Sequence, residues 1–119
     1  MQVRTLQILA DYNVWATEKL LEQVRKLTAE QFTSVPEGAY WSVRDTLAHT
    51  MDAEYGWRTG WTTGQRVPDL DYNDFSDCDA LETRWMQEYE ETREYLAGLD
   101  DADLDADFMG AGPIGYTIL

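Results

Sequence analysis

The chain has 119 residues and a mass of 13.7 kDa, a size typical of one domain with a single core. Nine Lys and Arg residues against 23 Asp and Glu residues give a net charge of −14, which disfavours nucleic acid and anionic membrane surfaces as partners. A hydrophobic fraction of 44%, with five Trp and seven Tyr residues, excludes a disordered composition.

Cysteine content and the pattern of apolar runs narrow the class further. The single cysteine, Cys78, excludes an intramolecular disulfide and a multi-thiolate zinc site within one chain. The N-terminus has no basic stretch followed by an apolar run, and no apolar run approaches the ~20 residues that cross a bilayer. We therefore expect a cytoplasmic protein without membrane contacts.

The first predicted helix covers residues 3–27. Apolar side chains recur there at spacings of three and four, which predicts one stripe facing the core. Its members are Leu6, Leu9, Asn13, Ala16, Leu20, Val24 and Leu27. Ile8, Tyr12 and Trp15 widen the stripe on one side. Residues 28–32 then predict a short helical turn.

The second predicted helix begins after Ser42, because Asp45 follows three residues later in a relative of the capping box. Gly60 and Gly64 mark its end. One face carries Val43, Leu47, Thr50, Met51, Glu54, Trp57, Arg58 and Trp61. The connection over residues 65–75 is too long for a tight hairpin, so it predicts a crossover that lets the second and third helices run parallel.

The third predicted helix has a similar start, with Ser76 as the cap and Asp79 three residues later. Gly98 is its expected stop. The helical period is carried by Leu81, Trp85, Thr92, Tyr95, Leu96 and Leu99.

An acidic stretch over residues 100–107 lacks the glycine and the closing glutamate of an EF-hand loop, and we interpret it as a solvated loop. Pro113 is suited to the first turn of a fourth helix, which is only begun when the sequence stops at Leu119. The sequence thus predicts a single all-α domain over residues 1–119, a four-helix bundle cut short at the start of its fourth helix.

The first two predicted helices carry the most distinctive residues of the chain. The second has Trp41-Ser42-Val43-Arg44-Asp45-Thr46-Leu47-Ala48-His49, followed by Glu54 and Trp57. The first has Tyr12-Asn13-Val14-Trp15-Ala16, followed by Leu20-Leu21. These runs resemble the DinB/YfiT-like superfamily of small bacterial four-helix proteins, with weaker agreement along the third predicted helix.

The resemblance implies an up-down-down-up bundle, usually a homodimer, with a divalent metal ion (zinc, nickel or iron) held by three histidines. Some members are thiol-dependent transferases or hydrolases. One family histidine lies on the second helix and matches His49, the only histidine in this chain. The other two form a pair four residues apart on the fourth helix, and the sequence stops at Leu119, where that pair would begin. The resemblance therefore assigns His49 alone as a metal ligand and leaves the catalytic residues unassigned.

Residues near His49 on the predicted helix bear on its role. Asp45 and Asp52 share its side and are placed to orient a ring nitrogen. The alternative is a capped or exposed histidine without a metal.

Two glutamates, Glu54 and Glu88, fall on apolar stripes. Arg58 follows Glu54 by four residues and Arg84 precedes Glu88 by four, which predicts two structural ion pairs at the edge of the core. The alternative is a general acid or base whose pKa is raised by burial.

The five tryptophans recur at helical spacing, which predicts core and dimer contacts, or alternatively a ligand pocket; they are Trp15, Trp41, Trp57, Trp61 and Trp85. Trp57 and Trp61 lie one turn apart, as expected of a pocket wall or a dimer seam. Cys78 falls at a helix start, where the helix dipole lowers a thiol pKa. Without a histidine partner in the sequence, we interpret it as incidental.

Two functions follow as hypotheses. The first is a divalent-metal-dependent enzyme, a homodimer acting on a small-molecule thiol or another small substrate of unknown identity. The second is a non-catalytic bundle that dimerises or binds a small molecule.

Overall fold

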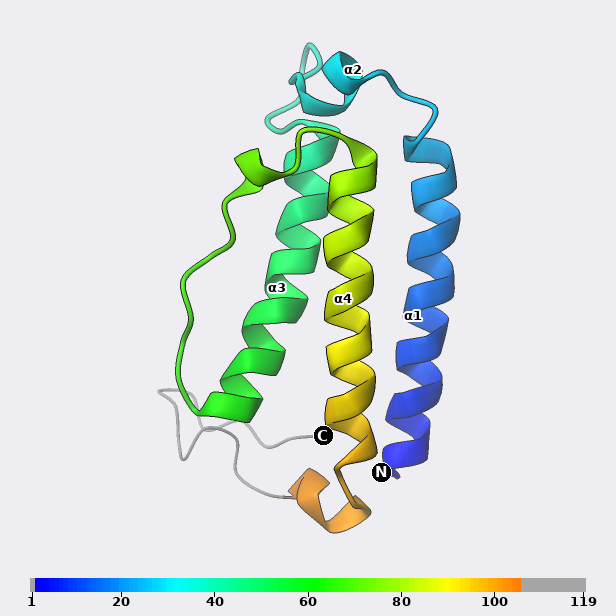
Figure 1. Cartoon of the computed structure of the whole chain (residues 1–119), viewed down its shortest axis with the longest axis vertical. Helices are drawn as coiled ribbons and strands as arrows, with labels where there is room; N and C mark the ends of the chain where they lie inside the picture. The colour runs from blue at the N-terminus through cyan, green and yellow to red at the C-terminus, as the bar shows by residue number, and fades with distance from the viewer. Residues whose placement is uncertain (1, 106–119) are drawn as a thin grey trace.

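The computed structural model describes residues 2–105, and every regular element in that range is helical (Figure 1). Three long helices make up most of the fold: α1 (Val3–Val24), α3 (Val43–Thr63) and α4 (Cys78–Ala97). Three short elements join or follow them: the helix α2 (Ala29–Thr33) and the 3₁₀ helices η1 (Tyr72–Asp74) and η2 (Asp101–Asp105).

The three long helices run up, down and down in chain order (Figure 1). After α3 ends, residues 64–77 return along the molecule, so that α4 runs parallel to α3 and antiparallel to α1. This confirms the predicted crossover. Helix α4 packs against both α1 and α3 and so forms the centre of the arrangement.

Side-chain caps start α3 and α4, and a glycine ends α3. Ser42 Oγ accepts a hydrogen bond from the backbone N–H of Asp45 at 3.0 Å, and Gly64 ends α3 in the left-handed conformation with φ 71°, both as predicted. For α4 the predicted cap was wrong by one residue. Asp77, rather than Ser76, accepts the hydrogen bond, from the backbone N–H of Ala80 at 2.8 Å.

The core lies between α4 and the inner faces of α1 and α3, and α2 closes one end. Its fully buried large side chains are Trp85, Phe32, Leu21, Met51 and Leu81. Trp85 and Leu81 come from the face of α4 that the helical period predicted. On α3, Leu47, Met51 and Arg58 are buried as expected, whereas Thr50 is exposed.

The buried face of α1 differs from the predicted stripe. The core contacts come from Val3, Val14, Thr17, Leu21 and Val24. Leu9 and Leu20 are 55% and 47% exposed, and the helix ends at Val24 rather than at residue 27. Helix α1 is apolar on two adjoining faces, and α4 covers only one of them. Periodicity marks both faces as apolar but does not say which one packs.

The acidic stretch was predicted to be a solvated loop, but its described part, residues 100–105, is ordered and includes the 3₁₀ helix η2. Asp101 Oδ1 accepts a hydrogen bond from the backbone N–H of Val3 at 2.7 Å, and Leu104 is 4% exposed. An acidic side chain therefore satisfies a free donor at the N-terminus of α1, where the helix dipole favours negative charge. Residues 106–107 and the predicted fourth helix at Pro113 lie outside the described residues.

Within residues 2–105, no helix combines the length and the apolar character that crossing a bilayer requires.

Two neighbouring leucines test which face of α1 is buried. Leu21→Ala is expected to lower the free energy of unfolding by about 2–5 kcal/mol, because Leu21 is fully buried. The matched change Leu20→Ala is expected to cost under about 1 kcal/mol. Chemical denaturation of both variants measures the difference. A larger loss of unfolding free energy for Leu20→Ala would show that the predicted stripe, and not the face with Leu21, is buried.

Candidate functional site

His49 lies on the first half of α3 and faces the returning crossover. Its Nδ1 is 3.1 Å from the hydroxyl of Tyr72, and that hydroxyl is 3.1 Å from Oδ2 of Asp52. The other oxygen of Asp52 accepts the backbone N–H of Leu70 at 3.0 Å. Trp41 packs its ring edge-on against the imidazole, with centroids 5.0 Å apart. The imidazole is thus held from two directions.

The chain of hydrogen bonds fixes which ring nitrogen carries the proton. Burial, followed by the hydrogen bond to Asp52, raises the pKa of Tyr72 to about 12, so its hydroxyl is protonated and donates to the carboxylate. Because that hydroxyl proton points to Asp52, the Tyr72 oxygen is left to accept a hydrogen bond from Nδ1–H of His49. Nε2 is left with its lone pair on an exposed side chain. An imidazole held in this tautomer is suited to bind a metal ion or to accept a proton.

The two aspartates predicted to orient His49 have different roles. Asp52 does so through Tyr72, as described above. Asp45 instead donates its backbone N–H to the capping Oγ of Ser42 and accepts a hydrogen bond from Arg44 Nε at 2.9 Å. Tyr72 could not be predicted from the sequence, because it lies 23 residues from His49, on the crossover, where no helical spacing links the two.

A catalytic metal centre needs about three protein ligands. Residues 2–105 contain no group of three His, Cys, Asp or Glu side chains placed to hold an ion. His49 alone fits a ligand position, through Nε2. The described residues therefore do not fit a complete metal centre.

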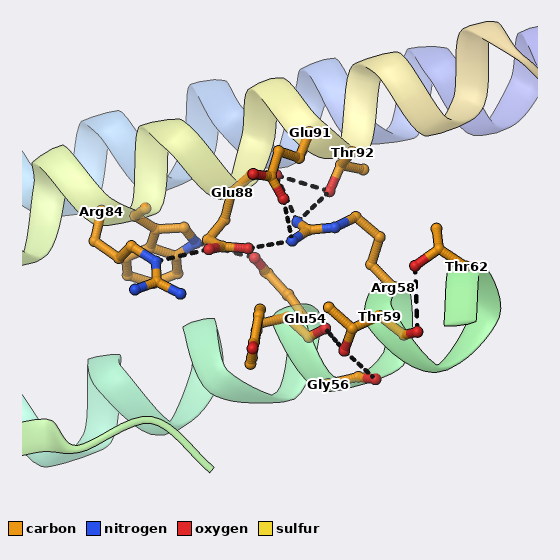
Figure 2. A network of polar contacts seen from close by, with 11 residues as sticks. Glu54, Gly56, Arg58, Thr59, Thr62, Arg84, Glu88, Glu91 and Thr92 are labelled. Atoms are coloured by element: carbon orange, nitrogen blue, oxygen red, sulfur yellow. Dashed lines mark hydrogen bonds and ion pairs between the residues drawn. The ribbon is translucent and has the colours of Figure 1, made fainter. Parts of the chain in front are cut away.

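Glu88, on α4, is the centre of a buried ion network (Figure 2). It is 4% exposed, and its two oxygens bind Arg58 of α3 and Arg84 of its own helix, the latter at 2.7 Å. Arg58 also donates to the Glu88 carbonyl oxygen at 2.8 Å and to Glu91 at 2.8 Å. The predicted Arg84–Glu88 pair is confirmed. The predicted Glu54–Arg58 pair is wrong, because Arg58 reaches across to α4.

Glu54 has neutral partners instead. Its Oε1 accepts from Asn13 Nδ2 at 3.0 Å and its Oε2 from the indole N–H of Trp85 at 2.9 Å. Asn13 also donates to the hydroxyl of Tyr89 at 3.2 Å, and that hydroxyl lies 2.7 Å from Oγ1 of Thr17. These polar contacts connect α1, α3 and α4. Burial and the nearby Glu54 carboxylate raise the pKa of Tyr89 to about 12.

A groove of about 740 Å³ lies between α1 and α3, with α4 as its floor; we call it the α1–α3 groove. Besides Asn13, Glu54, Arg58, Tyr89 and Thr92, its lining is apolar: Leu6, Ala10, Ala53, Trp57, Trp61, Tyr95, Leu96 and Leu99. Trp57 and Trp61 have ring centroids 6.3 Å apart, and Trp61 stacks on Tyr95 at 6.0 Å.

The tryptophans separate into two groups. Trp85 is 1% exposed and belongs to the core, as expected. The other four are 38% to 54% exposed in the single chain: Trp15, Trp41, Trp57 and Trp61.

Cys78 lies at the start of α4, as predicted, but its thiol is not activated there. The side chain is buried, and burial raises the thiol pKa, partly offset by the charge of Arg25. Desolvation of the thiolate is the largest cause of this shift, so the position at a helix start does not activate the thiol. Cys78 thus behaves as a small core residue.

The fold and the position of His49 define a class of protein, a helical-bundle domain with one exposed imidazole held by a tyrosine and an aspartate. The model of the DinB family matches residues 1–104, and the chain belongs to that family. Neither a curated protein nor a solved structure is similar enough to this chain to count as a match.

The ion network predicts an asymmetric response to one substitution. Arg58→Met is expected to lower the free energy of unfolding by about 3–5 kcal/mol, because Glu88 keeps a buried charge with one partner fewer. The same change at Arg93, whose ion pairs are exposed, is expected to cost under about 1 kcal/mol. Urea denaturation of both variants measures the two losses. Equal losses of unfolding free energy in the two variants would show that the buried network stabilises the fold no more than an exposed ion pair does.

Tyr89 predicts a pH dependence of stability. A pKa raised from 10.0 to about 12 in the folded chain means that its contribution is fully present below pH 10 and is lost as the pH rises toward about 12. The stability advantage of the wild type over Tyr89→Phe should therefore shrink across that range. Denaturation midpoints measured at several alkaline pH values test this, and a constant difference would contradict it.

Proposed function

We propose that this DinB-family chain is the metal-binding domain of a divalent-metal-dependent enzyme, with Nε2 of His49 as one ligand. The observation that carries the proposal is the hydrogen-bond chain from His49 through Tyr72 to Asp52. Metal-binding histidines commonly donate their other ring N–H to a partner that fixes the tautomer and raises ligand basicity. Family membership supports the same role.

The surroundings of His49 also favour a cation. A hollow of about 480 Å³ next to Tyr72 is lined in part by Asp69 and Asp71, and by Asp45 in an ion pair with Arg44. The chain as a whole carries a net charge of −14. Both features raise the local concentration of positive ions. At least two further protein ligands must come from outside residues 2–105, because the described residues supply only one.

The proposed reaction class is that of a thiol-dependent transferase or hydrolase on a small substrate, with zinc, nickel or iron as the metal. The substrate class rests on family resemblance.

The proposed assembly is a homodimer. Helix α1 exposes a second apolar face that α4 leaves uncovered, with Ile8, Leu9, Tyr12 and Trp15 each at least 52% exposed. A contiguous exposed apolar face of this kind is typical of a protein–protein contact. A two-fold pairing of identical α1 faces would bury it in both copies at once.

The α1–α3 groove favours a second candidate function, a non-catalytic domain that binds a small molecule. Its volume lies within the range of ligand pockets, and a few polar groups converge on an otherwise apolar lining.

A metal titration tests the first function. In a form of the protein that includes the remaining ligands, Zn²⁺ or Ni²⁺ competing with a chelating dye is expected to bind, and His49→Ala is expected to abolish that binding. Tyr72→Phe removes the acceptor that holds His49 Nδ1–H, so it is expected to weaken affinity by roughly 10- to 100-fold. Tyr12→Phe, the same change on an exposed side chain of α1, is the matched control. Unchanged metal stoichiometry in His49→Ala would overturn the metal proposal.

A further inference from the structure

Glu54 is a partly buried carboxylate whose charge no cation neutralises within residues 2–105. Both of its hydrogen-bond donors, Asn13 Nδ2 and Trp85 Nε1, are neutral. Each carboxylate oxygen accepts about two hydrogen bonds, so both retain capacity. Burying such a charge without compensation costs free energy.

The neighbouring ion network does not supply the missing charge. Arg58 binds Glu88 and Glu91, and Arg84 binds Glu88. With Glu54 included, two guanidinium groups face three carboxylates, which leaves one negative charge in excess. Figure 2 shows Glu54 extending from α3 toward α4 beside this network. Glu54 lines the α1–α3 groove together with Arg58, whose guanidinium is bound by Glu88 and Glu91.

Aromatic faces stand in the same groove. Trp57, Trp61 and Tyr95 line it, and the two indoles are 48% and 38% exposed. The π-faces of Trp and Tyr attract cations, particularly organic cations that are weakly hydrated. The rest of the lining is largely aliphatic, including Leu6 and Leu99. An anionic group, an aromatic wall and an apolar channel thus occur together.

We infer that the α1–α3 groove binds an organic cation with an apolar tail, of the quaternary ammonium class. The head group lies against Glu54 and the aromatic wall, and the tail follows the aliphatic lining toward Leu6 and Leu99. This inference rests on the second candidate function, binding of a small molecule. It is separate from the metal proposal, since Glu54 lies five residues after His49 and is turned roughly 140° around α3 from it.

The experiment compares three ligands with the same decyl tail on the 119-residue chain, each below its critical micelle concentration. The ligands are decyltrimethylammonium, uncharged decyl maltoside and decyl sulfate. Titration calorimetry in about 0.15 M salt limits long-range attraction by the net charge to about 8 Å. The cation is expected to bind roughly tenfold more tightly than the maltoside, and the sulfate more weakly than either.

Two variants with the same change in net charge locate the site. Glu54→Gln is expected to lower affinity for decyltrimethylammonium roughly tenfold while leaving the maltoside unchanged. Glu18→Gln alters an exposed carboxylate outside the groove and is expected to change neither. Equal losses in both variants would overturn the inference, because they would trace the preference to overall charge.

A third variant protects the test against misfolding of Glu54→Gln, which circular dichroism would detect. Trp61→Leu keeps the carboxylate and removes one aromatic face, and it is expected to weaken cation binding by roughly two- to fivefold.

The remaining outcomes are distinguishable. Equal binding of all three ligands would overturn the cation inference and leave the binding function in place. Binding of none would overturn both.

Discussion

The Arg58–Glu88 ion pair joins α3 to α4 inside the protein, and both candidate sites depend on the relative position of those helices. Arg58 is 4% exposed, so its guanidinium must be satisfied by α4. It binds the side chain and the backbone carbonyl oxygen of Glu88, which fixes the register of the two parallel helices. With Arg58 committed to α4, Glu54 is left to the neutral donors Asn13 and Trp85.

The crossover has a functional consequence as well as a topological one. Because α4 runs parallel to α3, residues 64–77 return along the molecule and bring Tyr72 to the first half of α3. Tyr72 then bridges His49 and Asp52, which a tight hairpin between the helices would not achieve. The same arrangement leaves α1 and α3 on either side of α4, with an open groove between them. The crossover over residues 64–77 thus accounts for the orientation of the imidazole. The central position of α4 accounts for the groove.

Much of the fold could be predicted from local sequence, because capping residues, glycines and helical spacing act over a few residues. The ends of α3 at Ser42 and Gly64 and the Arg84–Glu88 pair were correctly predicted in this way. Contacts between distant segments were not predictable. The buried face of α1, the bond from Arg58 to α4 and the role of Tyr72 each depend on which elements pack together. His49 was found through family resemblance, whereas its tautomer depends on a contact 23 residues away.

The central claim is that Tyr72 and Asp52 hold His49 with the proton on Nδ1, so that Nε2 offers a lone pair to a ligand. Nitrogen NMR of the imidazole in its neutral form, at alkaline pH, tests this directly, because a protonated and an unprotonated ring nitrogen have well-separated shifts. His49 is the only histidine, so its signals need no assignment. The account predicts a protonated Nδ1 and an unprotonated Nε2, with that preference reduced in Tyr72→Phe. A proton on Nε2 in the wild type would contradict it.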